Sequence, residues 1–552
     1  MKSKGQDTQR KRICVIGAGT AGLVATKVAL EEGQGAEVVC FERAAGLGGI
    51  WWYRPHEVEQ TTVMEFTVTN TSKEMSAFSD FPPSEDLPPY LPHREMLSYL
   101  RGYAKHFGVN DVIRFNIDVQ KVNKLENGRW RVEVCDHRSG STSAEEFDAV
   151  IVCIGHHSIP RLPHYTGQEL FQGRIIHAKL YKNTDGYRGK RVLVVGFGNS
   201  AADVATSLAG IAEQVYISVR RGTWMYSSHT GGVPSDFAHY TRFNRCLPPA
   251  LCSFLLYRYV QGWFNHDLIG FTPLHSADSQ MGTMNDFLPR ALLSSQIRLK
   301  PPIELFRENG VVFEGCGECV PIDEVIMATG YLPDVPFVDP KYYGKASLKG
   351  DVERLMLFKG IYSICDDSIG FVGMIDAIGN LGQLFEMQAR HFMAVYSGRT
   401  RLPPAKEARM TGIAQSIAKA TASFVGGSDR HAIMVDKMRY MDDLAKDIGA
   451  KPKWWKLFVR DPYLALKCFV GPLLPYQYRL VGPYSWPGAR EAIMSAWTRQ
   501  VASLRPTPSL PRTTVASGAP DPYTLRYAMF AVLALLLAMI AFISPILWAV
   551  SS

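Results

Sequence analysis

Residues 13–22 of this chain read ICVIGAGTAG, and this stretch is the strongest indication of its fold. Its first four residues are apolar and predict a buried strand, and the glycines that follow are spaced as GxGxxG before a helix-like run at 23–31. In this motif Gly17 permits a tight turn, Gly19 lets the backbone approach a pyrophosphate at the helix N-terminus, and Gly22 lets the helix lie close to the strand. The stretch therefore predicts a dinucleotide-binding βαβ unit.

A second strand-like stretch, at 37–41, completes this unit and ends in Glu42, whose carboxylate would accept hydrogen bonds from ribose hydroxyls. GxGxxG alone is a weak signal, because such glycines can merely shape a turn. The full order of strand, turn, helix and strand favours nucleotide binding. The expected contacts are Gly17, Ala18, Gly19, Thr20, Ala21, Gly22 and Glu42.

A second unit of the same kind is RVLVVGFGNSA at 191–201, with alanine in the third small position. Its next strand, expected at 215–219, ends in Arg220 and Arg221 instead of an acid. Two guanidinium groups suit the 2′-phosphate of NADPH, and no carboxylate is there to repel it. The alternative for these arginines is a solvated surface pair. The expected contacts are Gly196, Gly198, Asn199, Ser200, Ala201, Asp203, Arg220 and Arg221.

Two dinucleotide sites in one chain indicate a flavin that is reduced by a nicotinamide, because hydride transfer requires the two rings to stack at one place. We therefore expect an α/β protein with two Rossmann-like domains that bind FAD and NADPH. Fold alone does not determine what the reduced flavin does next.

Composition limits the remaining functional classes. The chain has 552 residues, 46% hydrophobic and 20% charged, which indicates a folded protein of several domains. The net charge of +8 comes from scattered basic residues, and no basic run is interleaved with aromatics, so we expect no nucleic-acid partner. Ten cysteines are too sparse for a disulfide framework and indicate a reducing compartment.

The C-terminal stretch 527–550 contains no charged residue and is long enough, as a helix, to cross a bilayer. A helix buried in the globular core is the alternative, but such helices rarely stay apolar all round for so long. Arg505, Arg512 and Arg526 precede the stretch, which places the catalytic body in the cytosol by the positive-inside rule. We therefore expect a transmembrane tail anchor with the lipid bilayer as a partner.

The expected domains follow from these segments. Residues 1–170 form the first part of the FAD-binding domain, and 171–330 form the NADPH-binding domain. Residues 331–504 continue the FAD domain into a C-terminal region. A proline-containing linker at 505–526 then leads to the anchor at 527–550.

Several motifs outside the glycine turns point to one family. They are GLGGIW at 46–51, NTSKEM at 70–75, FQGRIIHAKLY at 171–181, ATGY at 328–331, LVGP at 480–483 and WPGAR at 486–490. The third of these fits the fingerprint FxGxxxHxxx(Y/F/W) at every fixed position. With these motifs the sequence resembles the flavin-containing monooxygenases, of the microsomal dimethylaniline monooxygenase type, along almost its whole length.

The resemblance implies roles for further residues. Gly48, Gly49, Ile50 and Trp51 would lie along the FAD. Asn70 would face the reactive edge of the flavin as the catalytic residue, and its amide would position oxygen, NADP⁺ or substrate. Thr69 and Thr71 beside it would contact the cofactor. The alternative for Asn70 is an ordinary turn residue. We expect His177 to be structural, because the family's chemistry needs no base acting on the substrate.

The resemblance also implies the reaction. NADPH reduces FAD, dioxygen adds to form a 4a-hydroperoxide, and the distal oxygen passes to a soft nucleophile such as an amine nitrogen or a sulfide sulfur of a small molecule. A location at the endoplasmic reticulum membrane follows from the family. Homo-oligomerisation is left open.

The sequence leaves four alternative functions, each of which is set apart by particular residues or by its product. Baeyer–Villiger monooxygenases carry Trp-Pro where this chain has Tyr181 and Lys182, and an NADPH oxidase would release hydrogen peroxide instead of an oxygenated product. A thiol-disulfide flavoreductase could use Cys316 and Cys319, but these are expected in a hairpin turn without the helix N-terminus that lowers a thiol pKa. A tail-anchored scaffold with an inert nucleotide fold is the non-enzyme alternative.

One further pair of residues, two adjacent histidines, resembles part of a metal site. His156 and His157 are adjacent, but no third ligand stands at suitable spacing. We expect them to be loop residues.

Overall fold

The computed structural model describes residues 10–348, 352–423 and 433–504, which form two compact units. The first covers Met1–Asn70, Tyr90–Ser228 and Ser253–Gly449, and the second covers Thr71–Pro89, His229–Cys252 and Ala450–Ser552, each for the residues described. Both glycine-turn units fall in the first. The FAD and NADPH domain boundaries expected from the sequence remain predictions.

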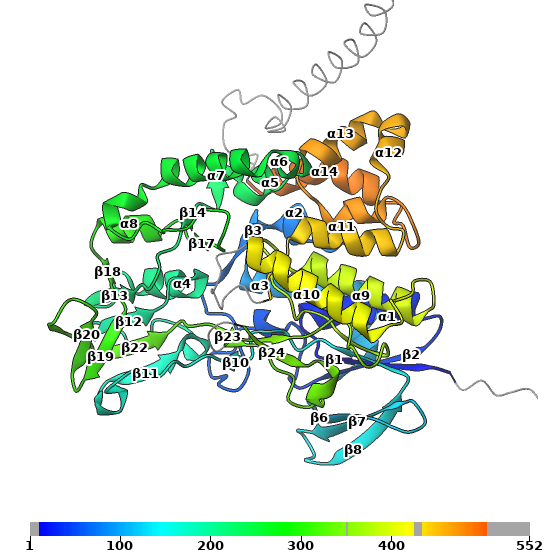
Figure 1. Ribbon diagram of the computed structural model, residues 1–552, viewed down its shortest axis with the longest axis horizontal. Coiled ribbons are helices and arrows are strands. Elements are labelled where there is room, and N and C mark those ends of the chain that lie inside the picture. Colours follow the sequence, from blue (N-terminus) through cyan, green and yellow to red (C-terminus); the bar gives the residue numbers. More distant parts are fainter. Residues whose placement is uncertain (1–9, 349–351, 424–432, 505–552) are drawn as a thin grey trace, which may run out of the picture. The chain divides into compact units, whose positions relative to one another are not determined.

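One five-stranded parallel sheet of the first unit has the order β26-β9-β1-β2-β5. Its central strands are apolar because both faces are covered. Helix α1 (Thr20–Glu32), with α9 (Gly382–Tyr396) against it, lies on one face, and the antiparallel strands β6, β7 and β8 cover the other (Figure 1). The strands are β1 (Arg12–Ile16), β2 (Glu37–Glu42), β5 (Ile113–Phe115), β6 (Ile117–Lys124), β7 (Trp130–Asp136), β8 (Thr142–Phe147), β9 (Ala149–Val152) and β26 (Ile369–Phe371).

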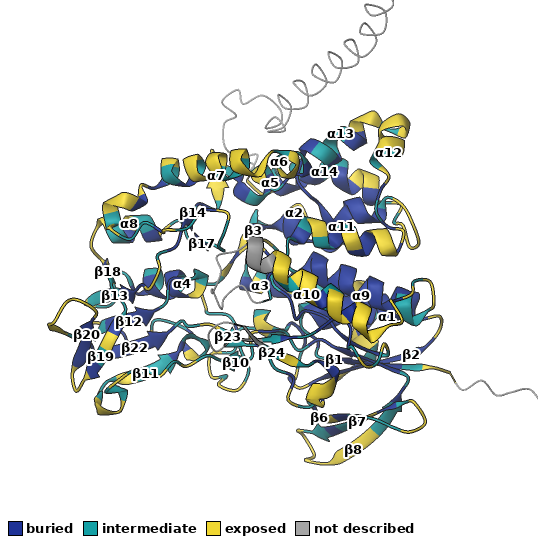
Figure 2. Ribbon diagram, viewed as in Figure 1, coloured by how far each residue is buried: buried dark blue, intermediate teal, exposed yellow. Residues whose placement is uncertain are grey.

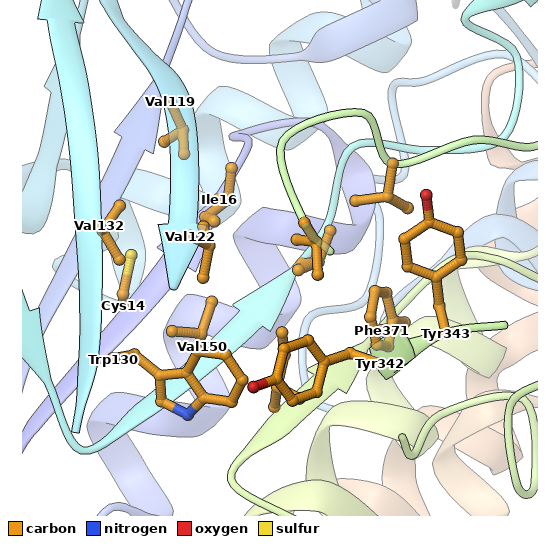
Figure 3. Close-up of a cluster of buried hydrophobic side chains, with 14 of the residues drawn as sticks. Cys14, Ile16, Val119, Val122, Trp130, Val132, Val150, Tyr342, Tyr343 and Phe371 are labelled. Atoms are coloured by element: carbon orange, nitrogen blue, oxygen red, sulfur yellow. The ribbon is translucent and has the colours of Figure 1, made fainter. Parts of the chain in front are cut away.

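The core under this sheet joins segments that are far apart in sequence. Trp130 is fully buried, its ring meets that of Tyr342 edge-on at 4.9 Å, and its indole N–H donates to the Ser368 hydroxyl at 2.8 Å. Figure 3 shows Trp130 and Tyr342 beside Val150 and Phe371 of the parallel sheet. This packing fixes the strand ends from which the first glycine turn begins.

A second five-stranded parallel sheet in the same unit has the order β11-β22-β12-β13-β18. Buried clusters cover both of its faces, so its central strands are dark blue in Figure 2. Helices α4 (Asn199–Leu208) and α8 (Leu288–Leu293) accompany it. The strands are β11 (Arg174–His177), β12 (Arg191–Val195), β13 (Gln214–Ser218), β18 (Ile297–Lys300) and β22 (Glu324–Met327).

Smaller elements complete the first unit. They are α3 (His93–His106), α10 (Lys406–Ser423), α11 (Lys437–Asp447), β4 (Tyr90–Pro92) and the two-stranded pairs β10 (Ile159–Pro160) with β23 (Tyr331–Leu332), β14 (Met225–Tyr226) with β17 (Thr283–Met284), and β24 (Lys345–Leu348) with β25 (Val352–Leu355). Strand β3 (Val68–Ser72) and helix α7 (Pro249–Trp263) each run from one unit into the other.

The second unit is mainly helical and has a charged pair at its centre. Glu74 is fully buried and accepts from Arg499 at 2.9 and 2.8 Å and from the Tyr476 hydroxyl at 3.0 Å. Burial raises the pKa of Glu74, and the hydrogen bonds and the charge of Arg499 oppose that rise. The elements are α2 (Lys73–Ser76), β15 (His229–Thr230), β16 (Val233–Pro234), α5 (Ser235–His239), α6 (Arg242–Cys246), α12 (Trp454–Arg460), α13 (Pro462–Val470) and α14 (Ala489–Ala502).

The α/β class with Rossmann-like sheets is confirmed. Across the described ranges, no helix combines the length and the apolar character needed to cross a bilayer. The predicted anchor at 527–550 and the predicted linker at 505–526 lie outside the described residues.

Candidate active site

The first glycine turn joins β1 to α1 as the sequence predicts. Gly17 has φ +99°, and a Cβ there would lie 2.8 Å from the Cys153 carbonyl oxygen. A Cβ on Gly22 would lie 1.7 Å from the Gly17 carbonyl oxygen, so only glycine lets helix and strand approach. Gly19 precedes the helix and offers no side chain to cap its free N–H groups. An anion is a suitable partner for these N–H groups.

A second loop lies against this turn. The N–H of Gly48 donates to the Ala18 carbonyl at 2.9 Å. A Cβ on Gly49 would lie 2.9 Å from the Gly19 Cα, and one on Gly48 would lie 2.4 Å from a methyl carbon of Leu97. Ile50 and Trp51 follow in the 3-10 helix η1 (Gly49–Trp51). Two backbone segments thus meet beside a helix N-terminus with no side chain between them, an arrangement that fits the pyrophosphate of FAD.

Glu42 connects the two segments. Its side chain is 8% exposed, and its carboxylate oxygens accept from the N–H of Ala18 at 2.6 Å and from the N–H of Ala44 at 2.7 Å. Burial raises the pKa of Glu42, and these two hydrogen bonds lower it. Because each carboxylate oxygen has a second lone pair, a ribose hydroxyl can still bind. The ribose contact remains a prediction.

The second glycine turn joins β12 to α4 in the same way. Gly196 has φ +114°, and a Cβ there would lie 2.6 Å from the Ala328 carbonyl oxygen. Gly198 precedes the helix, and Ala201 is fully buried against the strand. Ser200 is exposed on the first turn of the helix.

A segment that the sequence did not indicate borders this turn. The Thr283 hydroxyl donates to the Phe197 carbonyl at 2.6 Å, and the N–H of Met284 donates to the Asn199 side chain at 2.9 Å. The Asn285 amide donates to Asp203 at 2.9 Å. Burial raises the pKa of Asp203 to about 6, and this hydrogen bond opposes the rise. The contacts span more than 80 positions of sequence, so no local pattern could have found them.

Arg220 and Arg221 follow the end of β13, and both are exposed. The charge of Arg220 lowers the pKa of the Tyr165 hydroxyl, although burial raises that pKa overall. Burial lowers the pKa of His275, and the charge of Arg221 lowers it further. Both guanidinium groups thus lie at the surface after the carboxyl end of β13, and their contact with a 2′-phosphate remains a prediction.

The histidine of the sequence fingerprint, His177, is the last residue of β11 and contacts the segment that leads into β23. Strands β10 and β23 pair antiparallel, with Ile159 opposite Leu332. His177 Nδ1 accepts from the N–H of Lys179 at 3.1 Å, and Nε2 lies 3.0 Å from the Gly330 carbonyl oxygen, to which it donates. Burial lowers the pKa of His177. With both ring nitrogens bound to backbone, these contacts fit the structural role expected for this residue.

Asn70 lies on β3 with its side chain exposed. Its neighbour Thr69 is buried, and the Thr69 hydroxyl accepts from the N–H of Leu91 at 2.9 Å. Thr71, on the other side, is also buried. The amide of Asn70 is thus accessible, and its catalytic role remains a prediction.

Cys316 lies in a hairpin turn as the sequence predicts, whereas Cys319 is the first residue of the strand that follows the turn. Strand β20 (Gly310–Phe313) pairs antiparallel with β21 (Cys319–Pro321) beside β19 (Ile303–Arg307), and both Cys316 and Cys319 are exposed. His156 and His157 lie in a loop after β9, as expected. Within the described part of the chain, no group of histidine, cysteine and acidic residues is arranged to hold a metal ion.

Comparisons with known proteins agree with this arrangement. A sequence model of the FMO-like family, described as flavin-binding monooxygenase-like, matches residues 10–544. Dimethylaniline monooxygenase [N-oxide-forming] 2 from Rattus norvegicus is 36% identical over 96% of this chain and 98% of its own. Flavin-containing monooxygenase 5 from Cavia porcellus is 36% identical over 89% and 92%.

Two solved structures share the fold. S-allyl-L-cysteine S-oxygenase from Allium sativum has a TM-score of 0.60 at 23% identity and covers 83% of this chain and 94% of its own. A cyclohexanone monooxygenase in its open form has a TM-score of 0.58 at 16% identity, with 82% and 98% covered.

Proposed function

This chain belongs to the flavin-binding monooxygenase-like family, and from that premise we propose that it oxygenates soft nitrogen or sulfur atoms of small molecules at a site next to Asn70. It is an FAD- and NADPH-dependent monooxygenase. The observation that carries the proposal is the presence of two glycine turns, each before a helix, in one compact unit. Two such turns in one unit can hold a nicotinamide and a flavin within one chain, as hydride transfer between the two rings requires.

Each cofactor would be held by a separate set of residues. FAD would lie along the first turn and the 46–51 loop, with its ribose on Glu42. NADPH would lie along the second turn, with Arg220 and Arg221 on its 2′-phosphate. When bound, the flavin passes electrons from NADPH to dioxygen.

The protein's part in the reaction is to bind, orient and exclude water. The exposed amide of Asn70 can donate a hydrogen bond to oxygen, NADP⁺ or substrate, while the buried side chains of Thr69 and Thr71 fix the strand on either side. A soft nucleophile has no proton that an enzyme base must remove. Specificity then depends on access and shape, which allows a broad range of substrates.

The relatives support the substrate class. The name of the rat relative specifies an N-oxide product and dimethylaniline, a tertiary amine, and the name of the Allium sativum enzyme specifies sulfur oxygenation. The test is turnover of a tertiary amine and a thioether with NADPH and air. An N-oxide or sulfoxide is the expected product, and NADPH consumption with neither product would refute the proposal.

Baeyer–Villiger oxygenation is the second candidate, because a cyclohexanone monooxygenase shares the fold. The residues after His177 differ from the Trp-Pro of those enzymes. Tyr181 shares a hydrogen bond with the Ser207 hydroxyl at 2.8 Å, and the buried Lys182 ammonium donates to Thr62 at 2.7 Å. Burial lowers the pKa of Lys182 to about 8. Product analysis with a ketone and a thioether side by side separates the two reactions, and we expect oxidation of the thioether to dominate.

The tail anchor is part of the same proposal. The uncharged stretch 527–550 after Arg505, Arg512 and Arg526 supports anchoring in the endoplasmic reticulum membrane with the body in the cytosol. The membrane would then be where apolar substrates reach the enzyme.

A further inference from the structure

The segment 59–66, which precedes β3, has contacts with both nucleotide-binding sheets. The N–H of Val63 donates to the Ile50 carbonyl at 2.8 Å, which ties the segment to the loop beside the first glycine turn. Met64 packs against the buried cluster of the second sheet, which includes Phe197 of the second glycine turn. Two consecutive residues of this segment thus contact the two parts of the unit that are expected to hold FAD and NADPH.

The segment is fastened by the end of the fingerprint and by the lysine that follows it. The Lys179 ammonium donates to the Glu59 carbonyl at 2.6 Å, and the Lys182 carbonyl accepts from the N–H of Glu65 at 2.9 Å. Both ends of the segment are therefore bound to the chain that leads from β11 to the second glycine turn.

Tyr181, between these two lysines, connects the same segment to helix α4. Its ring meets that of Phe66 edge-on, with the centroids 6.3 Å apart. Its hydroxyl shares a hydrogen bond with the Ser207 hydroxyl at 2.8 Å. Because α4 begins at the second glycine turn, the placement of the segment depends on this helix as well.

The side chain of Lys182 is the energetically unfavourable part of this arrangement. It is 7% exposed, and its ammonium donates to the Thr62 hydroxyl at 2.7 Å. Burial lowers the pKa of Lys182 to about 8, so the group is still charged at neutral pH. A buried charge with a neutral partner costs free energy that a well-packed apolar side chain of similar length would not. A lysine buried in this way calls for a reason other than stability.

We propose that Lys182 is a positioning residue for hydride transfer, because its bond to Thr62 sets where the segment 59–66 lies between the flavin loop and the second sheet. This inference rests on the proposed assignment of the two glycine turns to FAD and NADPH. Thr62 directly precedes the residue that binds Ile50, so a shift at Thr62 is passed to the flavin loop. Hydride transfer is sensitive to such a shift, since a displacement of about 1 Å between reacting groups can slow a reaction about a hundredfold.

Lys182→Met removes the ammonium and keeps the length and most of the packing of the side chain. The flavin of the purified variant is reduced anaerobically in a stopped-flow instrument, once with saturating NADPH and once with dithionite. Dithionite uses no nicotinamide site, so its rate reports on the flavin alone. FAD content and melting temperature are measured alongside. Lys121→Met, at an exposed lysine on β6, is the matched control.

We expect NADPH to reduce the flavin of Lys182→Met about ten- to a hundredfold more slowly than that of wild type, with unchanged FAD content and dithionite rate. The melting temperature should equal that of wild type or exceed it, because no charge has to be buried. Lys121→Met should match wild type in every measurement. A wild-type NADPH rate in Lys182→Met would overturn the proposal. A slower rate accompanied by loss of FAD, a slower dithionite reaction or a lower melting temperature would also overturn it, since the role would then be structural.

Thr62 supplies a second pair of variants, which does not depend on the folding of Lys182→Met. Thr62→Ser keeps the hydroxyl and should keep the NADPH rate, whereas Thr62→Val removes the acceptor and should lower that rate about tenfold or more. Combining Thr62→Val with Lys182→Met should slow reduction no further than either change alone, because both remove the same bond. Equal NADPH rates in Thr62→Ser and Thr62→Val would overturn the proposal.

These rates require neither oxygen nor substrate, so they are distinct from the test of the proposed function. Wild-type protein that NADPH reduces but that forms no oxygenated product would refute the proposed function and leave the role of Lys182 intact. Wild-type protein whose flavin NADPH does not reduce would overturn both. Wild-type NADPH rates in Lys182→Met and Thr62→Val, in an enzyme that forms the N-oxide or sulfoxide, would overturn the inference about Lys182 alone.

Discussion

At the scale of single residues, the cofactor sites depend on glycines whose neighbours leave no room for a side chain. Gly17 and Gly196 occupy equivalent positions, each with positive φ, and at each a Cβ would lie closer to a carbonyl oxygen than van der Waals contact allows. Gly19 is different, because its φ of −76° suits any residue and a Cβ would lie 3.5 Å from the Gly49 Cα, an ordinary contact. The fold itself therefore does not require glycine at position 19, and we expect the requirement to come from the bound FAD.

Gly19→Val should give a folded protein without FAD, because the branched side chain would occupy space that the pyrophosphate needs. The measurement is the flavin absorbance per purified chain. Gly262→Val is a matched control, since a Cβ on Gly262 meets nothing within 4 Å, and it should keep its FAD. A normal FAD content in Gly19→Val would show that the first turn is assigned wrongly.

Replacing Arg220 and Arg221 together with alanine should weaken NADPH much more than NADH, because only NADPH carries the 2′-phosphate. A charge-assisted contact of roughly 1.5–3 kcal/mol corresponds to about ten- to a hundredfold in affinity. The measurement is the ratio of kcat/KM for the two cofactors. Arg298→Ala, an exposed arginine on β18, is the control and should leave the ratio unchanged. An unchanged ratio in the double variant would mean that the two arginines are surface charges.

Sequence predicted the residues of the glycine turns because their reasons are local. The motif fixes a turn, a helix start and a close approach of helix to strand within ten positions, and the structure agrees at Gly17 and Gly22. The contact of Gly19 with a pyrophosphate stays a prediction. The backbone partners of Glu42 and the hydroxyl that Lys182 binds were not predictable. They depend on loops that the fold brings together, such as that of Thr62, which is 120 positions from Lys182.

At the scale of elements, the sequence predicted most accurately the bounds of the strand that follows the helix in each glycine-turn unit. The strand expected at 37–41 is β2, which extends one residue further to Glu42, and the strand expected at 215–219 is β13, which runs from Gln214 to Ser218. The helix expected at 23–31 begins earlier, at Thr20, since its first turn contains the glycine and alanine residues of the motif itself. What prediction missed is the strand β17, whose contacts with the second turn come from a distant part of the chain.

These contacts give helix α4 a pH-dependent stability through Asp203. Burial raises the pKa of this carboxyl to about 6, so the folded state binds a proton more readily than the unfolded state does. Protonated Asp203 contributes its full share of the folding free energy below the pKa of about 3.9 that an aspartate has in the unfolded chain. This contribution is lost as the pH rises through the folded-state pKa of about 6.

Asp203→Asn keeps the Asn285 contact without the charge and should therefore stabilise the NADPH-free protein above pH 7 by on the order of 3 kcal/mol, and by about half of that at pH 5, which lies between the two pKa values. Thermal unfolding of both proteins at pH 5 and pH 8 measures the difference. An equal difference at both values would contradict the assigned cause.

The hairpin of β20 and β21 makes a second prediction at this scale. Serine at Cys316 and Cys319 should leave NADPH oxidation and FAD content unchanged, because Cys316 lies in an exposed turn, Cys319 begins strand β21, and neither thiol stands at a helix N-terminus that would activate it. Stopped-flow reduction of the flavin measures this. Loss of all NADPH oxidation in the double variant would favour a thiol-disulfide reductase.

At the scale of the whole molecule, both nucleotide turns belong to one compact unit, and a smaller helical unit is made from three separate stretches of chain. Sequence could predict the two Rossmann-like sheets, because each begins with its own motif. It could not predict the second unit, whose centre is the pairing of Glu74 with Arg499 across 425 positions. Neither residue stands out in the sequence from other charged residues.

Truncation after residue 510 should remove the proposed anchor and leave the nucleotide-binding elements, which end before it. The shortened protein should become soluble, or more easily extracted, with its FAD content and NADPH oxidation retained. Carbonate extraction of the full chain is the complementary measurement, and full release would contradict a bilayer-spanning segment.

The central claim is that this enzyme transfers one atom of dioxygen to a soft nucleophile at the expense of NADPH. The most direct measurement is turnover of a thioether or a tertiary amine under ¹⁸O₂, with mass analysis of the product and NADPH consumption followed together. We expect a sulfoxide or an N-oxide that carries one ¹⁸O atom and forms in step with the oxidation of NADPH. Hydrogen peroxide as the sole oxygen product, with no label in the substrate, would contradict it.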